Sequence, residues 1–246
     1  MDFDSEGVRL HYELHGPENR SPIVVVHGFA SDYSLNWVGT RWQETLVTNG
    51  FRVIGLDCRG HGRSDKPHDE AAYAVEVMTG DVVRLLDHLD VASAASLGYS
   101  MGARIGLEVV MEHPERITRA VLGGIGAAGA IDRAEQIAHA FRAGEPTEDP
   151  VAQTFYKFAS ARPANDLLAL AACINGLRPE RSLERLARIR TPILIVVGDR
   201  DEIARGAPEL VEEIPTARLV TIAGRDHMSA VPAREFKQAA VEFLSA

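Results

Sequence analysis

The fold of this chain is most narrowly limited by six short runs of apolar residues. They cover residues 23–28, 53–58, 95–100, 120–124, 193–198 and 219–224. Each run is continuously apolar instead of alternating between apolar and polar side chains, which is typical of strands buried on both faces of a parallel sheet. Such strands need helices on both faces to keep them from water. The sequence therefore predicts an α/β fold.

Stretches with helical periodicity lie between these runs. In residues 75–90 the apolar side chains fall on one stripe, and two further helical patterns cover residues 101–113 and 233–244. Residues 2–15 differ, because alternating apolar and polar side chains follow a turn at Glu6 and Gly7, which predicts a hairpin. The 246 residues fit one domain with this antiparallel hairpin at one sheet edge.

One long segment, residues 126–190, interrupts this alternation. It contains helical patterns at 134–143 and 165–176 and no convincing strand, and the letters GEPTEDP at 144–150 break it with proline and acidic residues. We expect a helical cap over 126–190, inserted into a core formed by residues 1–125 and 191–246. The alternative is a set of extra helices on the flank of the sheet.

Composition excludes several classes of function. The net charge of −9 and the pI near 5.5 give no basic surface for nucleic acid or an anionic membrane. No run reaches the eighteen apolar residues that span a bilayer, and the N-terminus lacks the basic and apolar regions of a secretory signal. Cys58 and Cys173 have no metal or redox spacing, so we expect buried, reduced thiols and a cytoplasmic protein. The oligomeric state is not indicated.

Ser100 stands between two glycines where a strand-like run passes into a helix-like one, in the order Gly98-Tyr99-Ser100-Met101-Gly102. A nucleophile on such a sharp turn sits in a strained backbone, and side chains two residues away on either side would collide. In open α/β sheets, ligands bind beyond the carboxyl ends of the strands. Ser100 is therefore the candidate nucleophile.

A serine hydroxyl needs a base that removes its proton. Among nine histidines, His227 follows the last apolar run and lies on the same rim as Ser100. The base in turn needs a carboxylate that holds its tautomer. The segment after the fifth run offers Asp201 as the first choice. Asp199 is the second and better suited to bracing the turn, and Asp132 is a third option.

Acyl transfer also requires hydrogen-bond donors for the oxyanion. The amide N–H of Met101, at the start of the helix after Ser100, points toward the site. The loop after the first apolar run offers a second amide at Phe29, which follows His27 and Gly28. A simple strand-ending turn is the alternative reading of these three residues.

These motifs together resemble the α/β-hydrolase fold family over nearly the whole chain. They occur in the family's order: His27-Gly28-Phe29, DCRGHGRSDKP at 57–67, the serine motif at 98–102, GDRD at 198–201 and His227. The resemblance implies a mostly parallel eight-stranded sheet flanked by helices. It also implies Ser100 as nucleophile, Asp201 as acid, His227 as base and the amides of Phe29 and Met101 as oxyanion hole, with no metal or organic cofactor.

The resemblance also narrows the chemistry. RGHGRS matches a structural turn of the family, so Arg59, His61 and Ser64 are expected to brace a loop. Members that open epoxides or remove halide carry aspartate in place of the nucleophilic serine, so Ser100 disfavours both reactions.

The expected function is therefore a serine hydrolase that cleaves carboxylic esters of small or medium, largely apolar substrates. Lactone, thioester or carbon–carbon bond hydrolysis and cofactor-free peracid formation use nearly the same residues in relatives and stay open, as does a ligand-sensing protein on the same fold. The expected partner is a small-molecule ester. The helical cap would roof its pocket, with candidate lining residues Phe141, Phe155, Tyr156 and Phe158.

Overall fold

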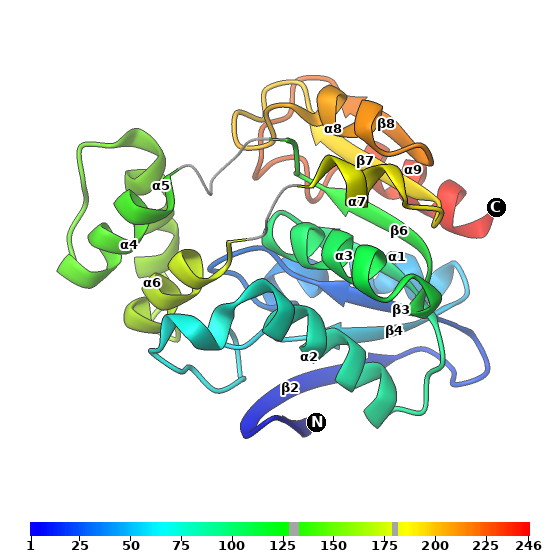
Figure 1. Ribbon diagram of the computed structural model, residues 1–246, viewed down its shortest axis with the longest axis horizontal. Helices are drawn as coiled ribbons and strands as arrows, with labels where there is room; N and C mark the ends of the chain where they lie inside the picture. The colour runs from blue at the N-terminus through cyan, green and yellow to red at the C-terminus, as the bar shows by residue number, and fades with distance from the viewer. Residues whose placement is uncertain (128–132, 179–181) are drawn as a thin grey trace.

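The computed structural model describes residues 1–127, 133–178 and 182–246. Within them, eight strands form one sheet in the order β1-β2-β4-β3-β5-β6-β7-β8 (Figure 1). They are β1 (Asp2–Ser5), β2 (Val8–His15), β3 (Ser21–Val26), β4 (Phe51–Leu56), β5 (Ala94–Tyr99), β6 (Ile117–Gly123), β7 (Ile193–Gly198) and β8 (Ala217–Ile222). β2 is antiparallel to both of its neighbours, and the other pairs are parallel. The predicted α/β class, the mostly parallel sheet and the edge hairpin are confirmed.

The six apolar runs correspond to β3 through β8, with ends that differ by a few residues. In β3, Ile23 and Val25 join the core on one face, whereas Val24 and Val26 join the core on the other. This two-sided burial is why the run is continuously apolar. β8 is an exception, because it is the edge strand and most of its side chains are only partly buried or exposed.

Helices cover both faces of the sheet (Figure 1). The apolar sides of α2 (Val75–His88), α3 (Met101–Glu112) and α8 (Ala207–Glu213) join one core, and those of α1 (Trp42–Thr48) and α9 (Arg234–Ser245) join the other. The shorter helical turns are η1 (Ser34–Val38), η2 (Glu70–Tyr73) and η3 (Pro114–Arg116). The sequence patterns did not predict η1 and α1, which bury two tryptophans completely, Trp37 and Trp42.

Three helices of the inserted segment pack together beyond one end of the sheet (Figure 1). They are α4 (Ala134–Ala143), α5 (Pro150–Ser160) and α6 (Leu167–Gly176), and we call them the α4–α6 lobe. The proline and acidic residues that interrupt the helical pattern begin α5: Asp149 accepts hydrogen bonds from the next free amides, and Pro150 takes the first helical position. The fourth helix, α7 (Leu183–Ala187), packs against α8 instead.

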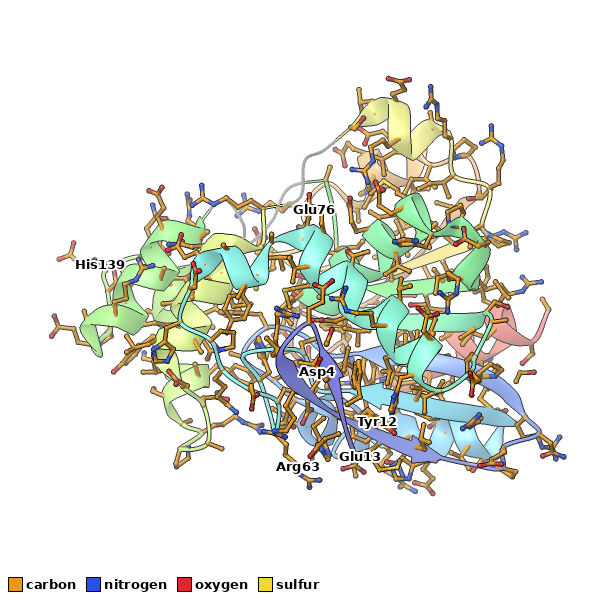
Figure 2. The ribbon with its side chains drawn as sticks, turned by 60° about the horizontal axis from the view of Figure 1, so that its bottom comes forward. Asp4, Tyr12, Glu13, Arg63, Glu76 and His139 are labelled. Carbon is orange, nitrogen blue, oxygen red and sulfur yellow. The ribbon has the colours of Figure 1, made fainter. Side chains whose placement is uncertain are left out.

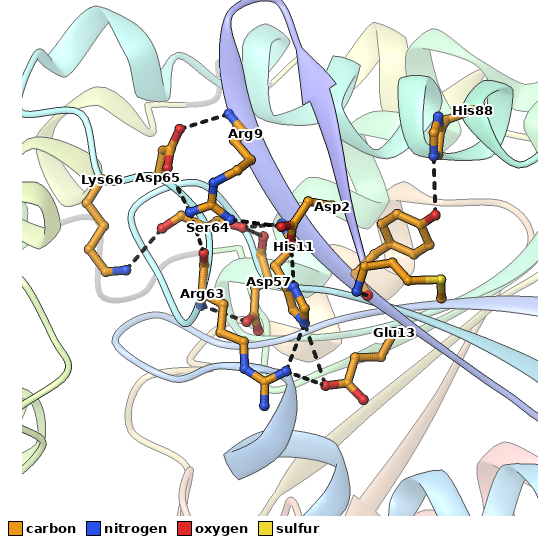
Figure 3. Close-up of polar contacts among 12 residues, drawn as sticks. Asp2, Arg9, His11, Glu13, Asp57, Arg63, Ser64, Asp65, Lys66 and His88 are labelled. Atoms are coloured by element: carbon orange, nitrogen blue, oxygen red, sulfur yellow. Dashed lines mark hydrogen bonds and ion pairs between the residues drawn. The ribbon is translucent and has the colours of Figure 1, made fainter.

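Polar contacts fasten the N-terminal hairpin to the loop after β4 (Figure 3). The guanidinium of Arg9 pairs with Asp65 at 2.9 Å. The hydroxyl of Ser64 accepts from the His11 amide at 2.8 Å and donates to the Asp57 carbonyl at 2.6 Å. Figure 2 brings this face forward, with Glu13 on β2 beside Arg63, with which it pairs at 3.1 Å. Ser64 therefore braces the loop, in agreement with its predicted structural role.

Candidate active site

Ser100 occupies the turn between β5 and α3 with φ 53° and ψ −110°, a left-handed backbone that a side chain rarely adopts. The flanking glycines allow this turn. A Cβ on Gly98 would lie 2.3 Å from the Gly102 carbonyl oxygen, and a Cβ on Gly102 would lie 2.0 Å from that of Val26. The serine is therefore held out at the end of its strand by close backbone packing.

The imidazole of His227 contacts the carboxylate of Asp201. Its Nδ1 lies 3.0 Å from Oδ1 and 2.9 Å from Oδ2 of Asp201, and both side chains are buried. Oδ1 also accepts hydrogen bonds from the amides of Ile203 at 3.0 Å and Ala204 at 2.9 Å. These donors fix the carboxylate in the loop after β7, and the carboxylate in turn orients the imidazole.

Of the two other candidate carboxylates, Asp199 lies among the described residues and makes no contact with His227 there. Asp199 accepts from the Gly224 amide at 2.7 Å and so ties together the loops that follow β7 and β8. Asp132 lies outside the described residues. The chain therefore brings Asp201 to the imidazole, while Asp199 braces the turn.

Tyr99 contributes a contact that the motif did not indicate. Its hydroxyl donates to the backbone carbonyl of His227 at 2.5 Å, and its ring centroid lies 5.3 Å from that of the imidazole. Burial raises the pKa of Tyr99 well above its usual range, so the hydroxyl stays a donor. The residue before Ser100 thus positions the backbone of His227. A tyrosine hydroxyl in a largely apolar strand, directly before Ser100, was the available signal.

The loop after β3 carries the amide of Phe29, which has no protein acceptor among the described residues. The buried His27 accepts from the Cys58 amide at Nε2 (3.0 Å), so its Nδ1–H donates to the Gly28 carbonyl (2.8 Å). Burial lowers the pKa of His27, which fits this neutral tautomer. Because N–H and C=O point in opposite directions across a trans peptide, fixing the Gly28 carbonyl turns the Phe29 N–H the other way.

Within the described residues, neither the Phe29 nor the Met101 amide donates to a protein acceptor. Asn36 adds a third donor. Its Oδ1 accepts from the Gly28 amide at 2.9 Å, and its buried Nδ2 has no partner in the part of the chain that the structure describes. These donors are available to a polar oxygen of a ligand.

Phe29, Asn36, Ser100 and His227 line one cavity of about 320 Å³, and Met101 is not among its described lining residues. Its walls are largely apolar, and Ser100 and His227 both face it; the described lining residues are Gly28, Phe29, Ser31, Leu35, Asn36, Thr40, Tyr99, Ser100, Thr154, Phe155, Phe158, Ile203, His227, Met228, Val231 and Pro232. Of the four lining candidates chosen from the sequence, Phe155 and Phe158 line it. The ring of Phe141 instead stacks on that of Phe29, with ring centroids 5.9 Å apart. The hydroxyl of Tyr156 donates to the Gly144 carbonyl.

The remaining histidines lie outside this cavity. His61 is buried, and its Nδ1 donates to the Arg59 carbonyl at 2.9 Å. Burial lowers its pKa to about 3. His139 is exposed on α4, at the far end of the lobe (Figure 2). The guanidinium of Arg59 pairs with the buried Asp81 at 2.6 Å. His61 and Arg59 therefore brace the loop after β4, as predicted.

Three further properties bear on the class of protein. Among the described residues, no three histidine, cysteine, aspartate or glutamate side chains gather where they could hold a metal ion. Cys58 and Cys173 are both buried free thiols. No helix in the described ranges has the length and apolar character to cross a membrane.

Comparison with known proteins agrees with this fold. A hydrolase from Pseudomonas aeruginosa PA01 has a solved structure that superposes with a TM-score of 0.84 at 27% identity, covering 100% of this chain and 98% of that one. The enol-lactonase of Burkholderia xenovorans LB400 superposes with a TM-score of 0.81 at 26% identity and complete coverage of both chains. A Bacillus subtilis (strain 168) protein with the provisional name 2-succinyl-6-hydroxy-2,4-cyclohexadiene-1-carboxylate synthase is 26% identical over 98% of this chain and 96% of its own length.

The sequence also matches the family model described as alpha/beta hydrolase fold over residues 21–172, which is more than half of the chain. This match includes the loop with Phe29 and the turn with Ser100. Because the family model, the sheet order and the superposed structures agree, the chain belongs to the α/β-hydrolase fold family.

Proposed function

We propose that this protein is a serine hydrolase that cleaves carboxylic esters of small or medium, largely apolar substrates. Its family and its relatives support hydrolase activity. The observation that carries the finer proposal is that Ser100 and the Asp201-bound His227 face one largely apolar cavity. A hydroxyl, an imidazole and a carboxylate in this order are the groups that acyl transfer requires.

In the proposed reaction, the Oγ of Ser100 attacks the ester carbonyl while Nε2 of His227 accepts the hydroxyl proton. Asp201 stabilises the resulting imidazolium through Nδ1. The amides of Phe29 and Met101 donate to the oxyanion of the tetrahedral intermediate. Its collapse expels the alcohol, which takes the proton from His227, and leaves an acyl-enzyme. Water activated by His227 then attacks the acyl group and releases the acid and the free serine.

The character of the walls supports a neutral substrate. The described lining residues include no lysine or arginine, so a carboxylate bound there would lose its hydration without gaining a cationic partner. The name of the Bacillus subtilis relative describes a product with a carboxylate on its ring. A neutral ester fits the walls of this cavity better than such a compound does.

Lactone hydrolysis is the second candidate, and the likeness to the Burkholderia enol-lactonase over the whole chain favours it. A lactone is a cyclic ester, so the same residues would open it. The two candidates differ in the fate of the alcohol. When the substrate is an open-chain ester, the alcohol leaves the site; when it is a lactone, the alcohol stays joined to the acyl group.

Labelling with a fluorophosphonate probe tests the proposal, because the probe reacts only with an activated serine. We expect the wild type and Ser160→Ala to be labelled and Ser100→Ala to stay unlabelled. Ser160 is an exposed serine at the end of α5 and serves as the matched control. A folded wild type that is not labelled would overturn the enzyme reading and favour a ligand-sensing protein.

Hydrolysis assays then separate the substrate classes. We expect higher kcat/KM for para-nitrophenyl acetate and butyrate than for lactones and thioesters, and a loss of about 10⁴-fold or more in Ser100→Ala. A higher kcat/KM for lactones would replace the ester proposal with the second candidate.

A further inference from the structure

Two side chains from the connection between α5 and α6 reach the loop that follows β3. The guanidinium of Arg162 pairs with the carboxylate of Asp32. The Nδ2 of Asn165 lies 3.3 Å from the Ala30 carbonyl oxygen and 3.1 Å from that of Ala159, and donates to both. Ala30 directly follows Phe29, so the lobe contacts the loop next to the Phe29 amide, which is proposed to bind the oxyanion.

This loop is short and conformationally constrained. Ala30 has φ 57°, a left-handed conformation that an alanine adopts only where its surroundings enforce it. The Ser31 amide donates back to the Gly28 carbonyl at 3.2 Å. Oδ1 of Asp32 accepts from the Leu35 amide at 2.7 Å. A shift of Asp32 or Ala30 would therefore rotate the peptide that carries the Phe29 N–H.

The ion pair is shielded enough to hold this loop. Asp32 is 13% exposed and Arg162 is 26% exposed. The pair between Arg142 on α4 and Glu70 on η2 also joins the lobe to the rest of the chain, but its side chains are 48% and 49% exposed. Solvent and salt weaken exposed pairs more than buried ones. Of these two connections, the stronger one therefore ends on the Phe29 loop.

The same part of the lobe also faces the cavity. Thr154, Phe155 and Phe158 of α5 line it, and the ring of Phe155 packs edge-on against that of Phe29 with centroids 5.7 Å apart. The helix that would contact an apolar substrate is thus joined to the oxyanion loop by an aromatic contact at one point and by the Arg162–Asp32 pair at another.

We infer that Arg162, Asp32 and Asn165 are positioning residues that aim the Phe29 amide at the oxyanion, so that the seating of the α4–α6 lobe sets the efficiency of the chemical step. This inference rests on the proposed function. It assigns the lobe a part in catalysis in addition to forming the roof of the cavity.

The test compares kcat and KM for para-nitrophenyl butyrate in Arg162→Ala, Asp32→Asn, the double variant and Asn165→Ala. We expect kcat to fall about 10- to 100-fold in both single variants of the ion pair, while KM changes less than about threefold. The double variant should lose no more than the worse single variant, because both break the same contact. Arg162→Lys should recover part of the loss, and Arg142→Ala, the matched control, should retain wild-type kcat.

A trifluoromethyl ketone, which forms a tetrahedral oxyanion with an active serine, gives a readout that a merely structural role would not change. Its Ki should rise in proportion to the loss of kcat/KM. Asp32→Asn keeps the shape of the side chain and an acceptor for Leu35, so it decides the question if Arg162→Ala does not fold.

A wild-type kcat in Asp32→Asn would overturn the inference. A rise in KM with unchanged kcat would also overturn it, because the lobe would then only help to bind the substrate. Neither result would affect the proposed function, which depends on labelling and ester hydrolysis by the wild type.

Discussion

Replacing Asp201 with asparagine should give an intact protein with almost no turnover. Oδ1 of Asp201 accepts from the amides of Ile203 and Ala204, and only an oxygen can accept these two bonds. The carboxamide oxygen of the asparagine must therefore take the place of Oδ1. Its NH₂ group then takes the place of Oδ2, which lies 2.9 Å from Nδ1 of His227.

This arrangement favours the wrong tautomer of the imidazole, because the NH₂ group lies 2.9 Å from Nδ1 and the carboxamide oxygen lies 3.0 Å from it. The NH₂ group donates to Nδ1, so the ring proton moves to Nε2, which can no longer accept the proton of Ser100. Loss of the correct tautomer costs about 10⁴-fold in kcat, or about 5 kcal/mol of transition-state stabilisation. The melting temperature should stay close to that of the wild type, because the shape and both backbone contacts persist.

The assay is hydrolysis of para-nitrophenyl butyrate, with stability measured by circular dichroism. Asp199→Asn is the matched control, because Asp199 contacts the Gly224 amide and not the imidazole, and we expect its kcat to stay within a few-fold of the wild type. A kcat within tenfold of the wild type in Asp201→Asn, or a larger loss in Asp199→Asn, would refute this reasoning.

Three other predictions concern residues around the site. Tyr99→Phe leaves the buried carbonyl of His227 without its donor, so we expect urea denaturation to show a loss of about 1–3 kcal/mol in the free energy of unfolding; unchanged stability would contradict the contact. Gly102→Ala places a methyl group 2.0 Å from the Val26 carbonyl oxygen, so circular dichroism should show a loss of more than about 3 kcal/mol or no folded protein, and wild-type stability would rule this packing out. Burial lowers the pKa of His61 from 6.5 to about 3 in the folded protein, so between these pH values the unfolded state binds one more proton than the folded state. The free energy of unfolding therefore includes a contribution from neutral His61 that is complete above about pH 7. It falls by about 1.4 kcal/mol per pH unit between about pH 6 and pH 4. The slope for His61→Asn should be smaller by about one proton, and equal slopes would exclude this origin.

Local sequence patterns were sufficient for the α/β class and for the groups that gather at the strand ends, although they missed η1 and α1. A strand buried on both faces is continuously apolar, so β3 could be recognised from Ile23 to Val26 without knowledge of its neighbours. Parallel strands end at one edge, which is why Asp201 and His227 could be paired although 26 residues separate them. To choose Ser100, Asp201 and His227 it was enough to know which strand each residue follows.

The shape of the cavity could not be predicted in the same way. Periodicity indicates that an aromatic residue is buried, but it does not show whether the residue fills space or borders it. Phe141 and Phe155 both read as buried positions of helices, yet only Phe155 lines the cavity. Likewise, Asp32 and Arg162 are 130 residues apart, and their contact depends on how the α4–α6 lobe seats on the sheet.

The strained backbone at Ser100 lowers the stability of the protein while it exposes the candidate nucleophile. A side chain at φ 53° costs on the order of 1–3 kcal/mol, and glycine would adopt this conformation without that cost. The unfolded glycine chain gains only about 0.4–1 kcal/mol of conformational entropy in return. The inactive Ser100→Gly protein should therefore survive heating better than its parent. Selection for heat resistance alone would therefore favour replacement of the nucleophile.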